Sequence, residues 1–175
     1  TEIGANVSLS DPGATEEQAC ETSGSPCEGY QIRVIDPDTG RDQPPGVPGE
    51  IVVKTPYIMQ GYYRAPAATA EVLKEGWFHT GDIGHLDAQG DLFITDRKKD
   101  MFVVGGFNAY PAEIEAVLVQ HPDVAQAAVV GVPDERLGEV GMAFVIARCD
   151  TTPTEEALIA FCRERMANYK VPRRV

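Results

Sequence analysis

The chain has 175 residues, of which 43% are hydrophobic, and its formal net charge is −12 at pH 7. A chain of this size and composition can bury one sizeable core or two small ones, so we expect a folded, soluble protein. Positive charge clusters only at residues 97–99 and in the tail 163–174. Because a nucleic-acid surface needs a basic face to neutralise phosphates, nucleic acid is excluded as a partner.

The sequence has no run of apolar residues near the ~20 that span a bilayer, and its N-terminus lacks the features of a signal peptide. We therefore expect no transmembrane segment and a cytoplasmic location. The four cysteines form no C-x-x-C pair, which favours free thiols over metal ligands or disulfides. The chain starts without an initiator Met and has no boundary feature at either end, so we expect it to be a piece of a longer protein.

The first half of the chain reads as β-rich. Residues 8–27 are rich in Ser, Thr, Gly, Glu and Pro and predict an exposed loop or a poorly ordered lead-in. Apolar and polar residues alternate over 30–34, and the β-branched run at 50–54 predicts a second strand that could pair antiparallel with the first. A short helix is expected over 67–74, after Pro66. A hairpin with strands 83–86 and 92–95 then completes a β-rich body that ends near Thr95.

The second half predicts a mixture of helices and strands. A short strand over 101–104 is broken by Gly105-Gly106, and a helix begins at Pro111 and stops at His121-Pro122. The class predicted for the whole chain is α+β, with a boundary near residues 97–100. The remaining expected elements are strands at 124–132 and 141–148 and a helix that opens at Thr154-Glu155.

The triplet Thr80-Gly81-Asp82 predicts a tight turn that presents a hydroxyl and a carboxylate. A carboxylate at such a tip can accept hydrogen bonds from two adjacent hydroxyls, which suits a ribose or another vicinal diol. The alternative is that Asp82 only caps its own turn. The neighbouring His79 and His85 are expected on the surface rather than as metal ligands, and Trp77 in packing.

Two further segments each allow two interpretations. The charged run at 96–100 is either a solvated loop or an anion contact combined with a flexible pivot between domains. Gly105-Gly106-Phe107 is either a turn with a core Phe, or a place where backbone without side chains approaches a narrow ligand closely.

Taken together, the motifs resemble the adenylate-forming superfamily, most of all its acyl-CoA synthetases. The resemblance covers nearly the whole chain from Tyr30 onward. It rests on an initial TE followed, in order, by GYQIRVID, GVPGEIVVKTPYIMQGYY, GWFHTGD, GDLFITDRKKDMFVVGGFNAYPAEIE, VVGVPDERLGEVGMAFVI and YKVPR.

This resemblance implies a fold. Residues 1–96 would form the last, β-rich and distorted barrel-like part of a large N-terminal adenylation domain. Residues 97–175 would form a small mobile α+β C-terminal domain, truncated before its end.

The resemblance also implies a reaction. A small-molecule carboxylic acid attacks ATP to give an acyl-adenylate and pyrophosphate, and the thiol of coenzyme A then displaces AMP to give a thioester. Mg²⁺ and cationic side chains would stabilise the phosphate charge in the first step. ATP, Mg²⁺ and coenzyme A are therefore the expected cofactors and substrates.

Individual roles follow by matching motifs. Thr1 would touch the adenylate phosphate, and Glu2 would help to hold Mg²⁺. Asp82 would bind the ribose, which reverses the preference for a simple cap, and Arg97 would meet the ribose or phosphate. Lys99 would be the hinge about which the C-terminal domain swings. Gly105, Gly106 and Phe107 would line the channel for the pantetheine arm of coenzyme A.

Parts of the family pattern are absent from these 175 residues. The phosphate loop and the acid pocket would precede Thr1 in the missing part of the N-terminal domain, and the adenylation lysine would follow Val175, since Lys170 is not at its position. We therefore expect the 175-residue chain alone to be inactive. Two alternatives stay open: an adenylation domain that loads a carrier protein, and a non-catalytic nucleotide-binding module.

Overall fold

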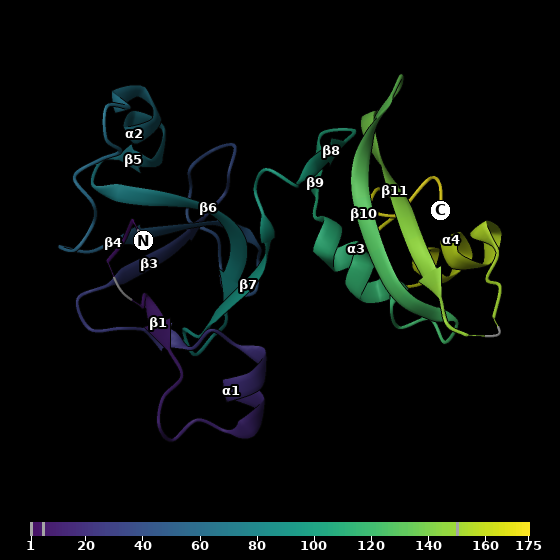
Figure 1. Ribbon diagram of the computed structural model, residues 1–175, viewed down its shortest axis with the longest axis horizontal. Coiled ribbons are helices and arrows are strands. Elements are labelled where there is room, and N and C mark those ends of the chain that lie inside the picture. Colours follow the sequence, from purple (N-terminus) through teal and green to yellow (C-terminus); the bar gives the residue numbers. More distant parts are fainter. Residues whose placement is uncertain (1, 5, 150) are drawn as a thin grey trace. The chain divides into compact units, whose positions relative to one another are not determined.

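The computed structural model describes residues 2–4, 6–149 and 151–175 (Figure 1). The chain divides into two compact units, Thr1–Lys98 and Lys99–Val175. Both units combine helices and strands, so the predicted α+β class is confirmed. The division falls between Lys98 and Lys99, whereas the sequence placed it before Arg97. None of the helices in the described ranges is long and apolar enough to cross a membrane.

The N-terminal unit is built on an open antiparallel sheet in the order β3-β4-β6-β5, with β7 paired to β6. The predicted antiparallel pairing of the first two strands, β3 and β4, is confirmed. Val34, Ile51, Val53 and Leu92 form a buried cluster at its centre. The strands are β3 (Gln31–Ile35), β4 (Gly49–Lys54), β5 (Leu73–Lys74), β6 (Trp77–Leu86) and β7 (Leu92–Arg97).

The predicted loop over residues 8–27 is wrong, because this segment forms short elements of its own. They are β1 (Ser8–Leu9), α1 (Glu16–Glu21) and β2 (Ser25–Pro26), and β1 pairs with β2. Thr15 and Gln18 cap the start of α1 reciprocally. The segment is tied to β7 by backbone bonds from Ser23 N–H to Leu92 O (2.7 Å) and from Leu92 N–H to Gly24 O (2.9 Å). Such long-range bonds leave no periodicity in the local sequence.

The helix expected over 67–74 is shorter than predicted. It is α2 (Pro66–Val72), with Pro in its first turn. Leu73 and Lys74 leave the helix and pair, as β5, with Phe78 and Trp77. Strand pairing therefore overrides the helical preference of these two residues.

The C-terminal unit packs two helices on one face of a sheet with the order β10-β11-β8-β9. Ile114 and Leu118 from the first helix and Leu158 and Cys162 from the second enter the same buried cluster. Strand β9 was not predicted, and the first helix ends at Leu118, one turn before the predicted stop. The elements are β8 (Phe102–Val104), β9 (Phe107–Ala109), α3 (Pro111–Leu118), β10 (Val124–Asp134), β11 (Gly138–Ala147) and α4 (Glu155–Arg163).

The packing of this unit predicts a graded response to glycine substitution. A Cβ at Gly131 would lie 2.5 Å from Phe102 Cβ, whereas a Cβ at Gly141 would lie 3.2 Å from Phe102 Cζ. Because overpacking a core costs about 1–3 kcal/mol, Gly131→Ala should lower the free energy of unfolding by that amount, and Gly141→Ala by less. Urea denaturation followed by far-UV circular dichroism measures both. Equal stability of the two variants would contradict the packing described.

Candidate functional site

The Thr80-Gly81-Asp82 triplet lies inside strand β6 (Trp77–Leu86) as a bulge, whereas the sequence predicted a tight turn. Across β4 and β6, Glu50 pairs with Ile83 and Val52 pairs with His79. The three residues of the triplet therefore stand opposite the single residue Ile51. A bulge of this kind bends the strand and redirects its side chains, here at the edge of a hollow.

Three hydrogen bonds fasten the bulge to its neighbours. The Thr80 hydroxyl donates to Ile51 O (2.8 Å) and accepts from Asp82 N–H (3.0 Å). Gly81 O accepts from Lys98 N–H (2.8 Å). Gly81 has φ of +72°, in the left-handed region that favours glycine. These bonds hold the bulge in one conformation. Ile51 O on the β4 side and Lys98 N–H on the β7 side each have a hydrogen-bond partner in it.

The bulge directs the Asp82 carboxylate toward Arg97 on strand β7. Arg97 Nε donates to Asp82 Oδ1 at 2.9 Å, and the two residues are register partners. The side chains are 58% and 31% exposed for Arg97 and Asp82 respectively. An accessible anion and cation thus lie side by side, and together they can receive ligand hydroxyls and an anionic ligand group.

The Asp82–Arg97 pair lies at the edge of a hollow of about 420 Å³ within the N-terminal unit. Its lining combines polar and charged side chains with apolar and aromatic ones. This combination suits a ligand that carries a flat ring together with hydroxyls or anionic groups. The lining residues are Glu2, Ile3, Tyr62, Val72, Phe78, His79, Thr80, Asp82 and Arg97.

Glu2 is a lining residue of this hollow, and Thr1 lies outside the described residues. Glu2 O accepts from Met59 N–H (2.7 Å), and the Tyr62 hydroxyl lies 3.4 Å from Glu2 Oε1. A hydrogen bond to its own backbone N–H lowers the pKa of the Glu2 carboxyl. Among the described residues, no group of three or more His, Cys, Asp or Glu is placed to hold a metal ion. A single ionised carboxylate fits Mg²⁺, which proteins bind through one or two carboxylates together with substrate phosphates.

A second charged cluster lies beneath the bulge and was missed by the sequence analysis. Glu50 is 4% exposed, and its Oε2 lies 2.8 Å from Lys98 Nζ and 3.2 Å from His79 Nδ1. Burial opposes ionisation of Glu50, but hydrogen bonds from Lys98 and His79 outweigh it, so the pKa of this carboxyl is lowered. The one signal in the sequence was a carboxylate at the start of an otherwise apolar strand.

These contacts correct three expectations. Lys98 is not part of a solvated loop, because its ammonium binds Glu50. His79 and His85 are half-buried rather than on the surface, and the His85 ring stacks on Phe93 at 4.7 Å. The packing expected of Trp77 is confirmed, since the Arg33 guanidinium lies 4.9 Å from its ring centroid.

The predicted hinge and channel residues lie in the C-terminal unit. Lys99 is its first residue and is exposed. Gly105 and Gly106 form the hairpin turn between β8 and β9, with φ of +58° and +89°. Phe107 is 60% exposed and stacks on Tyr169 with ring centroids 5.0 Å apart, so it is not a core residue.

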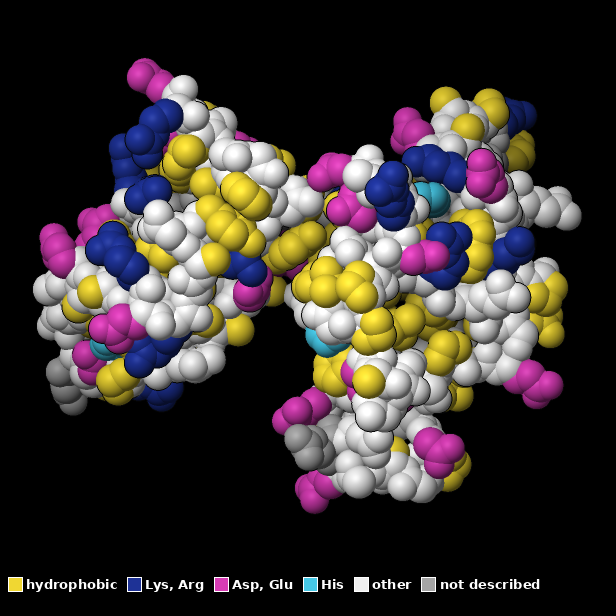
Figure 2. All heavy atoms as spheres, turned by 180° about the vertical axis from the view of Figure 1, so that it is seen from behind, with side chains coloured by type: hydrophobic (Ala, Val, Ile, Leu, Met, Phe, Trp, Pro, Cys, Tyr) yellow, Lys and Arg dark blue, Asp and Glu magenta, His cyan; other side chains and the backbone are white. Residues whose placement is uncertain are grey.

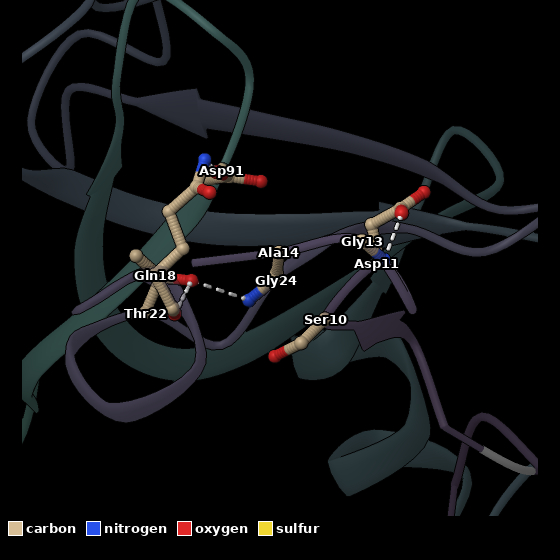
Figure 3. Close-up of a pocket in the computed structure, with 8 residues that line it drawn as sticks. All are labelled: Ser10, Asp11, Gly13, Ala14, Gln18, Thr22, Gly24 and Asp91. Atoms are coloured by element: carbon tan, nitrogen blue, oxygen red, sulfur yellow. Dashed lines mark hydrogen bonds between the residues drawn. The ribbon is translucent and has the colours of Figure 1, made fainter. Parts of the chain in front are cut away.

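Another hollow, of about 260 Å³, lies between the α1 segment and Asp91 (Figure 3). Asp11 and Asp91 both line it, and Asp91 Oδ2 accepts from Gln18 Nε2 at 3.4 Å. The sequence has no Lys or Arg before Arg33, and in Figure 2 the end of the N-terminal unit that carries α1 displays acidic side chains. The negative charge makes this hollow a poor site for an anionic ligand, unlike the one beside Arg97.

Known protein families match part of each of the two units. The AMP-binding enzyme family matches residues 1–63, and the AMP-binding enzyme C-terminal domain matches residues 113–175. The chain belongs to the adenylate-forming, AMP-binding superfamily. The two matched segments lie in different compact units, and the Asp82–Arg97 pair falls between the matched ranges.

Curated relatives of this superfamily member include acyl-CoA ligases. A 2-succinylbenzoate–CoA ligase from Geobacillus kaustophilus is 52% identical over 136 residues, which are 78% of this chain and 28% of the relative. A long-chain-fatty-acid–CoA ligase from Escherichia coli is 49% identical over 152 residues, or 87% of this chain and 27% of the relative. The chain thus spans less than a third of these relatives.

Solved structures give the same family. The O-succinylbenzoate coenzyme A synthetase of Bacillus subtilis in complex with AMP is 34% identical with a TM-score of 0.79, covering 99% of this chain and 34% of that chain. An amide bond synthetase from Marinactinospora thermotolerans is 42% identical, also with a TM-score of 0.79, covering 89% of this chain and 32% of that chain.

The lowered pKa of Glu50 predicts how the stability of the N-terminal unit depends on pH. A carboxyl whose pKa in the folded state is below its ordinary value of 4.5 contributes stability above that pH, and loses it as the pH falls through the folded value. The free energy of unfolding should therefore exceed that of Glu50→Gln at about pH 7, and the gap should close as the pH falls below about 4.5. Urea titrations of both proteins across this range measure it. A gap of constant size would contradict the expectation.

Proposed function

We propose that this chain supplies the ribose-binding floor and the mobile C-terminal domain of an ATP-dependent, AMP-forming acyl-CoA ligase. One observation carries the proposal: Asp82, held on the bulge of β6, pairs with Arg97 of β7, and both line a hollow that has polar and apolar side chains in its wall. Membership of the superfamily and the activities of its relatives support it.

In the first half-reaction a carboxylate attacks the α-phosphate of ATP, an acyl-adenylate forms and pyrophosphate leaves. Asp82 would accept hydrogen bonds from the ribose hydroxyls, using the oxygen that Arg97 leaves available, and Arg97 would contact the ribose or the phosphate. Thr1 would contact the phosphate, and Glu2 would contribute one oxygen to Mg²⁺. When bound, Mg²⁺ neutralises phosphate charge.

In the second half-reaction the thiol of coenzyme A attacks the acyl carbon and AMP leaves. We assign residues 97–175 to the mobile domain, with Lys99 as its hinge. Gly105 and Gly106 have no side chains to block a narrow pantetheine arm, and the exposed ring of Phe107 would form a wall of its channel.

The acceptor of the acyl group has alternatives other than coenzyme A. The similarity to an amide bond synthetase favours a second candidate, in which the same adenylate is transferred to a nucleophile other than coenzyme A. A carrier-protein thiol is a third acceptor, and a non-catalytic nucleotide-binding module is the remaining alternative. Supplying coenzyme A, amines and a carrier protein in parallel assays of adenylate consumption distinguishes them.

The role of Asp82 can be tested in a chimera. The part of this chain that matches the Geobacillus kaustophilus ligase over 136 residues would replace the corresponding residues of that ligase. Asp82→Ala should slow ATP–pyrophosphate exchange by about a hundredfold, because two charge-assisted hydrogen bonds to the nucleotide are lost. The 175-residue chain alone should release no pyrophosphate.

A matched control for this variant exists in the same sheet. Asp42 pairs with Arg33 through a single Nε–Oδ1 contact of 2.6 Å, and its side chain is 64% exposed. Asp42→Ala should leave the exchange rate within about twofold, since exposed pairs contribute little. Equal losses in both variants would refute a ribose-binding role for Asp82.

The hinge role of Lys99 predicts a separation of the two half-reactions. In the same chimera, Lys99→Pro fixes φ and should reduce thioester formation at least about tenfold, while ATP–pyrophosphate exchange changes by no more than about threefold. Lys99→Ala retains backbone freedom and should support both half-reactions. Thioester formation at the wild-type rate by Lys99→Pro would show that the pivot lies elsewhere.

A further inference from the structure

We infer that Glu50 is a positioning residue: its buried carboxylate fixes both strands that carry the Asp82–Arg97 site. The consequence for ligand binding rests on the function proposed above, whereas the consequence for local structure does not.

The position of Glu50 places its carboxylate below the bulge. Glu50 precedes Ile51, the residue that faces the bulge, and it pairs with Ile83 on the far side of the triplet. Glu50 is 4% exposed, whereas charged side chains are rarely buried. Burying a carboxylate costs free energy unless the carboxylate is paired and hydrogen-bonded. The next three residues of β4, Ile51, Val52 and Val53, are apolar and buried, so an apolar side chain would be the ordinary choice at position 50.

The partners of Glu50 flank the site on both strands. His79 immediately precedes the bulge on β6, and Lys98 immediately follows Arg97 at the end of β7. Both approach the same oxygen, Oε2. Because an ionised carboxylate only accepts hydrogen bonds, His79 Nδ1 must carry the proton in this contact. One oxygen therefore links the residue before Thr80 to the residue after Arg97.

Lys98 is fixed at both its backbone and its side chain. Its N–H donates to Gly81 O at 2.8 Å, and its Nζ donates to Glu50 Oε2 at 2.8 Å. Because Lys98 is held by two hydrogen bonds, the backbone of the adjacent Arg97 is restrained. The Arg97 side chain is then positioned to donate to Asp82 Oδ1. An ion pair as exposed as Asp82–Arg97 does not hold this geometry strongly by itself, so the buried contact beneath it is the more effective restraint.

The inference predicts a localised loosening when the Glu50 charge is removed. Hydrogen exchange measured by NMR on the 175-residue chain should show the Lys98 and Asp82 amides of Glu50→Gln exchanging about tenfold faster, since a hydrogen bond to a charged group is lost. Lys98→Met should accelerate exchange of the Asp82 amide similarly, and adding Glu50→Gln to it should add little.

Two comparisons separate positioning from a general structural role. Because Glu50→Gln also lowers the free energy of unfolding, amides that open only by global unfolding, such as Val52 and Val53 in the centre of β4, should exchange faster by that amount. A rise at Lys98 and Asp82 no larger than the rise at Val52 and Val53 would show that Glu50 only stabilises the fold, and would overturn the inference. Glu113→Gln is the matched control, because Glu113 binds Lys170 at 2.6 Å in the other unit, and it should leave the Lys98 amide unchanged. Unchanged exchange at Lys98 and Asp82 in Glu50→Gln would also overturn it.

A titration with AMP tests the functional consequence separately. Glu50 does not line the hollow, so it acts on a bound nucleotide only through the residues that it holds in place. Glu50→Gln should therefore weaken AMP binding by about tenfold. Equal affinity of both proteins for AMP, with faster exchange at Lys98, would overturn the functional part and leave the structural part standing. If the wild-type sequence bound no AMP even within the chimera, the ribose-binding role proposed for this chain would fail, and hydrogen exchange on the 175-residue chain would still decide the positioning of Lys98.

Discussion

The N-terminal unit depends on one constraint, which is that a buried backbone carbonyl needs a hydrogen-bond donor. Three residues of β6 face Ile51 alone, so the ladder cannot continue there. The Thr80 hydroxyl replaces the missing donor at Ile51 O and at the same time receives Asp82 N–H. A side chain thus completes the sheet, and the extra residues become a platform that directs Asp82 toward Arg97.

The charged side chains around the bulge differ in exposure: Asp82 and Arg97 are accessible to solvent, whereas Glu50 is buried. Asp82 and Arg97 are accessible, so their attraction is screened by water and contributes little to stability. Such a pair is free to exchange its partner for a ligand. Glu50 is buried, so it depends on Lys98 and His79 and holds them in turn. The accessible pair faces the hollow, and the buried contact supports it from below.

In the C-terminal unit, the short β8–β9 hairpin is exposed at its turn and anchored in the core through β8. Phe102 and Val104 of β8 are buried in the core with α3 and α4, while the Gly105-Gly106 turn and Phe107 stay exposed. Tyr169, far along the chain, supports the Phe107 ring. Glycines supply the positive φ that a two-residue turn needs, and an aromatic stack replaces core burial as the restraint on the hairpin.

The sequence by itself determined the features that depend on local chemistry. Alternation and β-branching predicted β3 and β4, proline predicted the starts of α2 and α3, and the order of motifs predicted the superfamily. The tertiary structure alone decided that residues 8–27 form elements tied to β7, that Leu73 and Lys74 join a sheet, and that Glu50 binds Lys98. Each of these depends on partners distant in the chain, such as the 48 positions between Glu50 and Lys98, and no local propensity records such a contact. The same holds for Thr80-Gly81-Asp82: the sequence predicted that it presents a hydroxyl and a carboxylate, but only the register of β4 against β6 showed that it is a bulge.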